Sequence, residues 1–238
     1  TLESVIEKEG KEKLVGTRSL DFPYFPVLIK LIDAKDNLSI QVHPDNEYAK
    51  RVEHEFGKTE IWYVIDATDD AQLVYGFKNK ISKEEFKKAI EENTLLDVLN
   101  TVKVKKGDLF FIEAGTVHAI GKGVLIAEIQ QNSNSTYRVY DYGRIGKDGK
   151  PRELHIKKAV DVSVTEPPKY DIKPMGETVK ADGYDSTLLT KCDLFTVNHY
   201  DVNKKLTLET DEKSFNHILV INGSGNINEK ELNKGDSF

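Results

Sequence analysis

A short polar stretch within an apolar segment is the first place where this sequence could do chemistry. Residues 38–44 read Leu-Ser-Ile-Gln-Val-His-Pro, and their apolar and polar side chains alternate as they do in a β-strand. Gln41 and His43 would then enter a buried environment together, where an unpaired amide and an unpaired imidazole are costly. A metal ion would satisfy both groups, and Glu60 and His118 are the further candidate ligands.

Two imidazoles, a carboxylate and an amide oxygen suit a divalent ion of borderline hardness. Zinc is the first choice, and one zinc ion per chain would leave an open position for water or substrate. Iron and manganese also accept such ligands. The sequence therefore predicts a metal centre with zinc as the expected ion.

The remaining histidines and the one cysteine have simpler interpretations. His54 falls on the charged face of an expected helix, and His155 is expected to be structural. His199 and His217 lie in the C-terminal part of the chain without a glutamate partner, so we expect no metal there. Cys192 is expected to be a buried thiol rather than a nucleophile.

Short strands and one prominent helix must position the candidate ligands. Strands are expected at residues 60–65, 73–77, 102–105, 108–112, 123–131 and 137–142, and helices after His43, over 82–99 and over 152–162. Ser82 and Glu85 form a capping box at the start of the longest helix. Many short strands separated by turns predict a mainly β fold, a sandwich or jelly-roll barrel with a helical insert at about residues 82–99.

An internal repeat indicates two domains of one type. The sequence Lys-Gly-Asp-Leu-Phe at residues 106–110 recurs as Lys-Gly-Asp-Ser-Phe at residues 234–238. We expect a metal-binding domain over 1–165, a linker over 166–184, and a second, smaller β-domain over 185–238 that is incomplete and free of metal. The chain starts without Met and stops inside an expected strand, so we also expect further residues at both ends.

Composition excludes several classes of protein. The 238 residues are 38% hydrophobic and 31% charged, and the formal net charge of −6 does not favour a nucleic-acid partner. The lone cysteine suits a reducing compartment, no apolar run reaches the roughly 18 residues of a membrane span, and no signal peptide is visible. We expect a cytoplasmic protein without a nucleic-acid or membrane partner; no feature indicates its oligomeric state.

Several sequence blocks resemble two related families. The segment from Gly107 to His118 resembles the second metal motif of the cupins, with Glu113 where cupins usually have proline. Residues 41–45, 57–63, 114–123, 128–133 and 136–142 are similar to the type I mannose-6-phosphate isomerases in their short bacterial form. This resemblance covers about residues 20–165 and implies a cupin jelly roll followed by a second cupin-like domain.

The resemblance to the isomerases also implies a function. It implies a zinc-dependent aldose–ketose isomerase that interconverts mannose 6-phosphate and fructose 6-phosphate through an enediol(ate). The matching zinc ligands are Gln41, His43, Glu60 and His118, and the arginine matching Arg138 is regarded as an active-site residue in the family. A sugar phosphate also needs cations to hold its phosphate. The remaining site candidates are Lys58, expected to be catalytic with Arg138, and Lys122 and Glu128, expected to bind substrate.

Two other classes of function stay open. One is another metal-dependent cupin enzyme of the dioxygenase type, and the other is a non-catalytic sugar-binding cupin. For Arg138, the simpler alternative is a salt bridge to Glu128 or Asp141. Metal analysis combined with a coupled assay on fructose 6-phosphate would separate the three classes.

Overall fold

The computed structural model describes residues 1–238, which separate into two compact units. The first unit contains residues 1–26, 181–184 and 201–238, and the second contains residues 27–180 and 185–200. All the candidate site residues fall in the second unit, so its strands and helices decide how the site is built.

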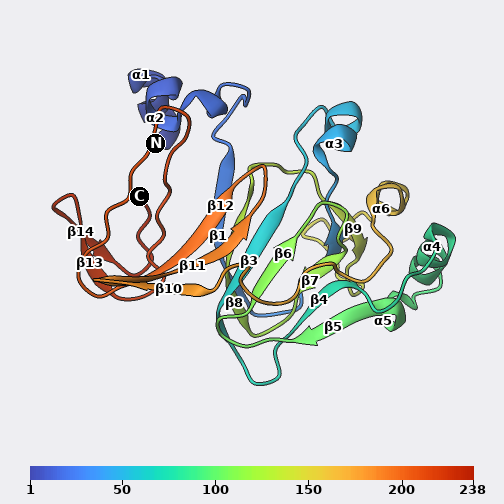
Figure 1. Cartoon of the computed structure of the whole chain (residues 1–238). Helices are drawn as coiled ribbons and strands as arrows, with labels where there is room; N and C mark the ends of the chain where they lie inside the picture. Colours follow the sequence, from blue (N-terminus) through green and yellow to red (C-terminus); the bar gives the residue numbers. More distant parts are fainter. The chain divides into compact units, whose positions relative to one another are not determined.

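Two antiparallel sheets form the body of the second unit (Figure 1). One has the strand order β1-β8-β3-β6 and the other the order β5-β4-β7-β2-β9. The strands are β1 (Val27–Ala34), β2 (Ile40–Val42), β3 (Glu60–Ala67), β4 (Gln72–Phe77), β5 (Leu99–Lys103), β6 (Leu109–Ile112), β7 (His118–Ile120), β8 (Val124–Gln131) and β9 (Tyr137–Tyr140). The prediction of a mainly β sandwich is confirmed.

Side-chain alternation divides each strand between the space inside the sandwich and an outer face. Trp62 and Ile126 of one sheet share a buried apolar cluster with Leu73 and Ile120 of the other, so this cluster lies between the sheets. Because side chains alternate with a period of two, residues an even number of positions away in the same strand enter the same space. Glu60, two residues before Trp62, is one of these.

Helices cover the outer face of the five-stranded sheet. They are α3 (Asn46–Val52), α4 (Lys83–Glu91), α5 (Leu95–Val98) and α6 (Ile156–Val162). Ile40 and Val42 of β2 are fully buried in a second cluster with Phe86 of α4 and Ala159 of α6. The other face of β2, which carries Gln41, is therefore the one that turns to the inside of the sandwich, as the sequence predicted.

The helical insert is shorter than the predicted helix over residues 82–99. The capping box is present, since Ser82 Oγ accepts from Glu85 N at 3.1 Å and Ser82 N donates to Glu85 Oε2 at 2.7 Å. Asn93 adopts φ 56°, a left-handed conformation that ends a helix, and Leu99 already begins β5. The predicted continuous helix is therefore wrong in its second half. The helix predicted over 152–162 likewise begins later, at Ile156.

Residues 185–200 fall in the second compact unit, together with the sandwich. The strands β10 (Thr178–Ala181), β11 (Tyr184–Lys191) and β12 (Thr196–Val202) form a three-stranded sheet. Leu189 of β11 packs against Ile61 and Leu109 on the outer face of the four-stranded sheet. This apolar contact explains why the compact units divide the chain differently from the expected boundaries at 165 and 185.

The first unit joins the two ends of the chain. It contains α1 (Leu2–Glu9), α2 (Lys11–Val15), the 3-10 helix η1 (Thr17–Ser19), β13 (Ser224–Ile227) and β14 (Lys230–Asn233). Thr17 N donates to Glu212 O at 2.9 Å, and Phe25 lies 4.9 Å from Phe215 between ring centroids. None of the helices in the chain is both long enough and apolar enough to cross a membrane.

The repeated Lys-Gly-Asp sequence forms the same turn at both places. Asp108 Oδ2 accepts from Lys105 N at 2.9 Å, and Asp236 Oδ2 accepts from Asn233 N at 2.7 Å. The glycines between them have φ values of 90° and 94°. The shared turn supports the expected second β-domain of the same type in the C-terminal part of the chain, which stays a prediction.

Candidate metal centre

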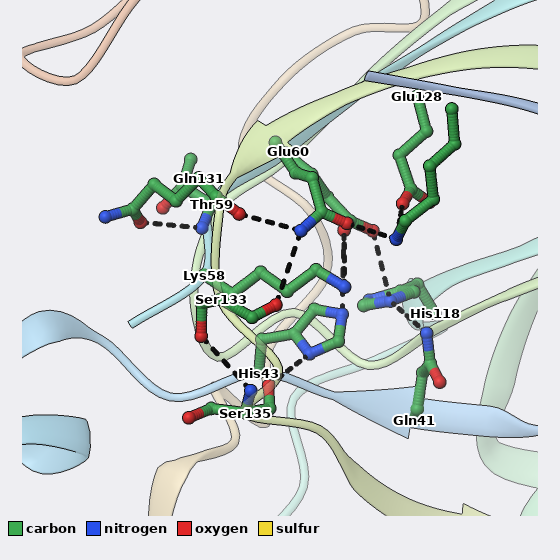
Figure 2. A network of polar contacts seen from close by, with 12 residues as sticks. Gln41, His43, Lys58, Thr59, Glu60, His118, Glu128, Gln131, Ser133 and Ser135 are labelled. Atoms are coloured by element: carbon green, nitrogen blue, oxygen red, sulfur yellow. Dashed lines mark hydrogen bonds and ion pairs between the residues drawn. The ribbon is translucent and has the colours of Figure 1, made fainter. Parts of the chain in front are cut away.

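Three of the predicted ligands meet at one end of the space between the sheets. His43 follows β2, Glu60 begins β3 and His118 begins β7, and their candidate ligand atoms all lie within 4.8 Å of one another. The exposed fractions of the three residues are 1%, 0% and 0%. Figure 2 shows both imidazole rings turned toward the carboxylate.

The atoms at the centre of this cluster lack hydrogen-bond partners within the protein. His43 Nε2 and both carboxylate oxygens of Glu60 are buried without a hydrogen bond. His43 Nε2 lies 3.6 Å from Glu60 Oε2, and His118 Nε2 lies 3.4 Å from Glu60 Oε1. Leaving such groups unpaired is costly, and one divalent cation between them would satisfy all of them. The donor set therefore fits a metal ion.

Both histidines are held in the form that binds a metal. His43 Nδ1 donates to Ser135 O and His118 Nδ1 donates to Thr116 O, each at 2.9 Å. With the proton on Nδ1, the lone pair of each Nε2 faces Glu60. Burial, followed by the charge of Lys58, holds the pKa of His43 well below its usual range, and burial lowers the pKa of His118 to about 4. Both rings are therefore neutral at pH 7.

The charge balance of the cluster also favours an added cation. Burial, and then the negative charge of Glu128, raise the pKa of Glu60 to about 7. Lys58 opposes this shift, because its buried Nζ lies 3.4 Å from Glu60 Oε2. A positive ion beside the carboxylate would favour its ionised form further. Lys58, a predicted catalytic residue, is thus part of the cluster.

Gln41 lies beside His118 as the alternation predicted. In the sheet Gln41 is directly opposite His118 on one side and Arg138 on the other, so the three side chains share one face. The amide nitrogen of Gln41 is 3.4 Å from His118 Nε2. A half-turn of the amide would present its oxygen instead, and Gln41 can therefore serve as a fourth ligand.

Glu128 belongs to the same space and has a partner that the sequence analysis missed. Lys30 Nζ donates to Glu128 Oε1 at 2.7 Å, and Trp62 Nε1 donates to Glu128 Oε2 at 3.1 Å. Lys30 lies in an apolar run over residues 27–32, to which the sequence analysis assigned no role. Its signal was available, since it is the one charged residue in that run and its neighbours are all apolar.

Arg138 makes neither of the salt bridges considered as alternatives. Its Nη1 donates to Glu153 O at 2.9 Å, and its Nε is buried without a hydrogen-bond partner. The carboxylate of Asp141 is bound by Arg144 and Arg152 instead. Arg138 therefore keeps a buried donor on the sheet face that carries Gln41 and His118.

Lys122 does not join the cluster. It is exposed in the turn between β7 and β8, where its backbone N donates to Asn37 Oδ1 at 2.9 Å. Val124, just after it, is paired with Ala67, the last residue of β3, whereas Glu60 is the first. At about 3.3 Å per residue the two ends of β3 are roughly 23 Å apart. The structure thus corrects the expectation that Lys122 lies at the site.

The other singled-out residues lie outside the cluster. His54 is exposed, but in a loop with φ 57° rather than on the predicted helix. His155 Nδ1 accepts from Arg138 N at 3.2 Å, a structural role.

His199 stacks on the ring of Tyr63. Cys192 is only partly buried, so the expectation of a buried thiol is corrected.

Fold and site together define a cupin-type β-barrel with a buried place for a metal ion at one end. Residues 2–90 match the family described as "Phosphomannose isomerase type I, catalytic domain". The chain is 44% identical over 204 residues to mannose-6-phosphate isomerase ManA of Bacillus subtilis, covering 85% of this chain and 64% of that protein. The chain belongs to the type I mannose-6-phosphate isomerase family.

Solved structures agree with this assignment. The crystal structure of mannose 6-phosphate isomerase from Bacillus subtilis superposes with a TM-score of 0.86 and 38% identity, covering 98% of this chain and 73% of that one. A zinc-bound mannose 6-phosphate isomerase structure has a TM-score of 0.68 at 18% identity, over 100% of this chain and 79% of that one, and shares the fold. The chain spans about two thirds of ManA, at 64% of its length.

Proposed function

We propose that this chain carries the active site of an isomerase that interconverts mannose 6-phosphate and fructose 6-phosphate. The observation that carries the proposal is the buried cluster of His43, Glu60 and His118, in which His43 Nε2 and both Glu60 carboxylate oxygens lack hydrogen-bond partners. Family membership supports the substrate, because the relatives are named mannose-6-phosphate isomerases.

One zinc ion per chain is the proposed cofactor. His43, Glu60 and His118 would hold it, with the Gln41 oxygen as the fourth ligand after rotation of the amide. Two imidazole nitrogens and a carboxylate oxygen are common ligands in catalytic zinc sites, which keep a position open for substrate. A solved structure of the same fold is described as zinc bound, which supports this choice of metal.

The reaction moves a proton between C1 and C2 of the sugar and passes through an enediol(ate). When bound, the metal ion would polarise the substrate carbonyl and stabilise negative charge on its oxygen. Lys58 and Arg138 are the proposed catalytic residues of the chain itself. The Lys58 ammonium is buried beside Glu60, and the Arg138 guanidinium shares the face of Gln41, so both place positive charge where the enediolate charge develops.

Glu128 is proposed to bind the sugar. Its carboxylate is fixed by Lys30 and Trp62 within the same space, so its remaining lone pairs can accept from sugar hydroxyl groups. Arg138 is assigned to electrostatic stabilisation rather than proton abstraction, because the pKa of an arginine is too high for a general base.

A coupled assay tests the proposal directly. Purified protein with zinc is mixed with mannose 6-phosphate, and fructose 6-phosphate is measured by the reduction of a nicotinamide cofactor in a linked reaction. We expect steady formation of fructose 6-phosphate. Binding of mannose 6-phosphate without conversion would instead indicate a sugar-binding cupin. If the protein shows no binding and no conversion of mannose 6-phosphate, the proposed substrate is rejected.

A further inference from the structure

The loop between β8 and β9 holds the ring of one candidate metal ligand. His43 Nδ1 donates to the Ser135 carbonyl oxygen at 2.9 Å, and the exposed fractions of the two residues are 1% and 6%. Because the proton is held on Nδ1, the Nε2 lone pair faces Glu60. The direction of this one carbonyl therefore sets both the tautomer and the orientation of the His43 ring.

Ser133 holds the backbone of Ser135 through two hydrogen bonds of its hydroxyl group. Ser133 Oγ donates to Phe56 O at 2.7 Å and accepts from Ser135 N at 3.1 Å. Ser133 is 4% exposed, so water has little access to replace either bond. The hydroxyl thus ties the loop after β8 to the loop that leads into β3, which carries Glu60.

Glu55 holds the same loop from its other side. Its Oε1 accepts from Asn134 N at 3.2 Å, and its Oε2 lies 3.5 Å from Ser135 Oγ. The preceding His54 has φ 57°, which is uncommon for a residue other than glycine. Backbone strain of this kind persists where the surrounding contacts require it. The turn at His54 thus stands directly before Glu55, whose carboxylate contacts the loop after β8.

We propose that Ser133 is a positioning residue of the metal centre, whose hydroxyl holds His43 Nε2 toward the metal ion through the Ser135 carbonyl. His118 depends on no such loop, because its Nδ1 bonds to Thr116 O, two residues earlier in its own turn. His43 is thus the ligand whose orientation relies on a distant part of the chain. The inference rests on the zinc site of the proposed function, and not on the isomerase reaction.

Zinc affinity of the metal-stripped protein tests this role. The dissociation constant for zinc alone is measured by competition with a chelator for wild type, Ser133→Ala and Ser133→Thr. Loss of an outer hydrogen-bond partner weakens metal binding by about 10–100-fold, and we expect Ser133→Ala to fall in this range. Ser133→Thr keeps the hydroxyl and should bind zinc more tightly than Ser133→Ala.

Ser163→Ala is the matched control. Ser163 is also buried, at 3% exposed, and its Oγ donates to Ala159 O at 2.7 Å at the C-terminal end of α6. Its substitution should lower thermal stability but change zinc affinity by no more than about twofold. An equal loss of zinc affinity in both alanine variants would show general destabilisation and overturn the proposal.

The state of the His43 ring is the second readout. Nitrogen chemical shifts of metal-free wild type should show the proton on Nδ1, whereas Ser133→Ala should show a mixture of tautomers. A loss of zinc affinity below tenfold in Ser133→Ala would overturn the proposal.

If Ser133→Ala does not fold, Glu55→Ala replaces it in the zinc titration. A loss of zinc affinity of less than threefold in Glu55→Ala would then overturn the proposal. Zinc-loaded wild type without isomerase activity would reject the reaction and leave this result standing.

Discussion

Glu60 is the residue on which the metal centre depends most. Its carboxylate is fully buried, has no hydrogen-bond partner and lies between two neutral histidines. Glu60→Gln keeps the size of the side chain and removes its charge. Loss of an outer hydrogen-bond partner of a metal ligand already weakens metal binding by about 10–100-fold. We therefore expect loss of the Glu60 ligand itself to weaken zinc binding by roughly 100-fold or more. Zinc competition titration measures the loss, and unchanged affinity would contradict the site.

A matched control for that experiment is Glu153→Gln. The Glu153 side chain is 83% exposed, so the same chemical change there should leave zinc affinity unaltered.

Arg138 is expected to act on turnover and not on metal binding. Its buried Nε has no hydrogen-bond partner and its side chain shares the sheet face of Gln41 and His118. Removal of one preorganised charge donor lowers turnover by roughly 100-fold or more, so we expect this for Arg138→Ala. Zinc content, measured by elemental analysis, should stay at the wild-type level. Wild-type turnover in this variant would exclude Arg138 from the reaction. The control is Arg51→Ala, the same substitution at an exposed arginine on α3.

Asp141 links acid stability to the loop that follows β9. Burial alone would raise its pKa, but hydrogen bonds from Arg152 and Arg144 outweigh burial and hold the pKa below its usual range. Because the pKa is lower in the folded protein than in the unfolded chain, ionised Asp141 stabilises the fold above about pH 4. This contribution is lost as the pH falls through the folded-state pKa.

Asp141→Asn should therefore destabilise the protein in a pH-dependent way. We expect the free energy of unfolding to fall by about 1–3 kcal/mol at pH 7, the scale of hydrogen bonds to a charged group. The difference from wild type should shrink as the pH falls from about 4 through the folded-state pKa of Asp141. Denaturant unfolding at several pH values measures it, and a difference that stays constant with pH would contradict the role of the charge.

At the scale of elements, alternation along single strands made much of the site predictable. The period of two in β2 placed Gln41 and His43 on one face, and the structure puts Ile40 and Val42 on the other. Alternation does not say which strands are neighbours, because pairing joins residues far apart in the sequence. The Lys30–Glu128 contact and the separation of Lys122 from the site depend on such pairing, and both were missed.

The loop before β3, which contains Gly57, offers a test of how the fold positions Glu60. A Cβ at Gly57 would lie 2.3 Å from Asp45 C and 2.5 Å from Asn46 N. Gly57→Ala must therefore move the chain just before Lys58 and Glu60. Overpacking of this kind costs about 1–3 kcal/mol, and we expect this loss in thermal or denaturant unfolding together with weaker zinc binding.

Gly225→Ala is the control for that substitution. Nothing lies within 4 Å of a Cβ at Gly225, so alanine there should change neither stability nor zinc affinity appreciably. Equal effects at the two glycines would show that the close approach at Gly57 does not matter.

At the scale of the whole molecule, composition and strand pattern predicted the fold class, and the repeated Lys-Gly-Asp sequence predicted a shared turn. The division into compact units was not predictable from those patterns. Leu189 packs on the sandwich and residues 1–26 join residues 201–238 through backbone hydrogen bonds, and both are contacts between distant segments. The family's jelly roll was predictable from resemblance, whereas these boundaries depend on tertiary packing.

Titration of the metal-stripped protein with zinc, followed by conversion of mannose 6-phosphate to fructose 6-phosphate, tests the central claim most directly. A single site built from His43, Glu60 and His118 predicts that activity is absent without metal. Activity should then rise in proportion to added zinc and level off at about one equivalent per chain. Full activity in the metal-free protein, or no conversion at one bound equivalent, would contradict the account.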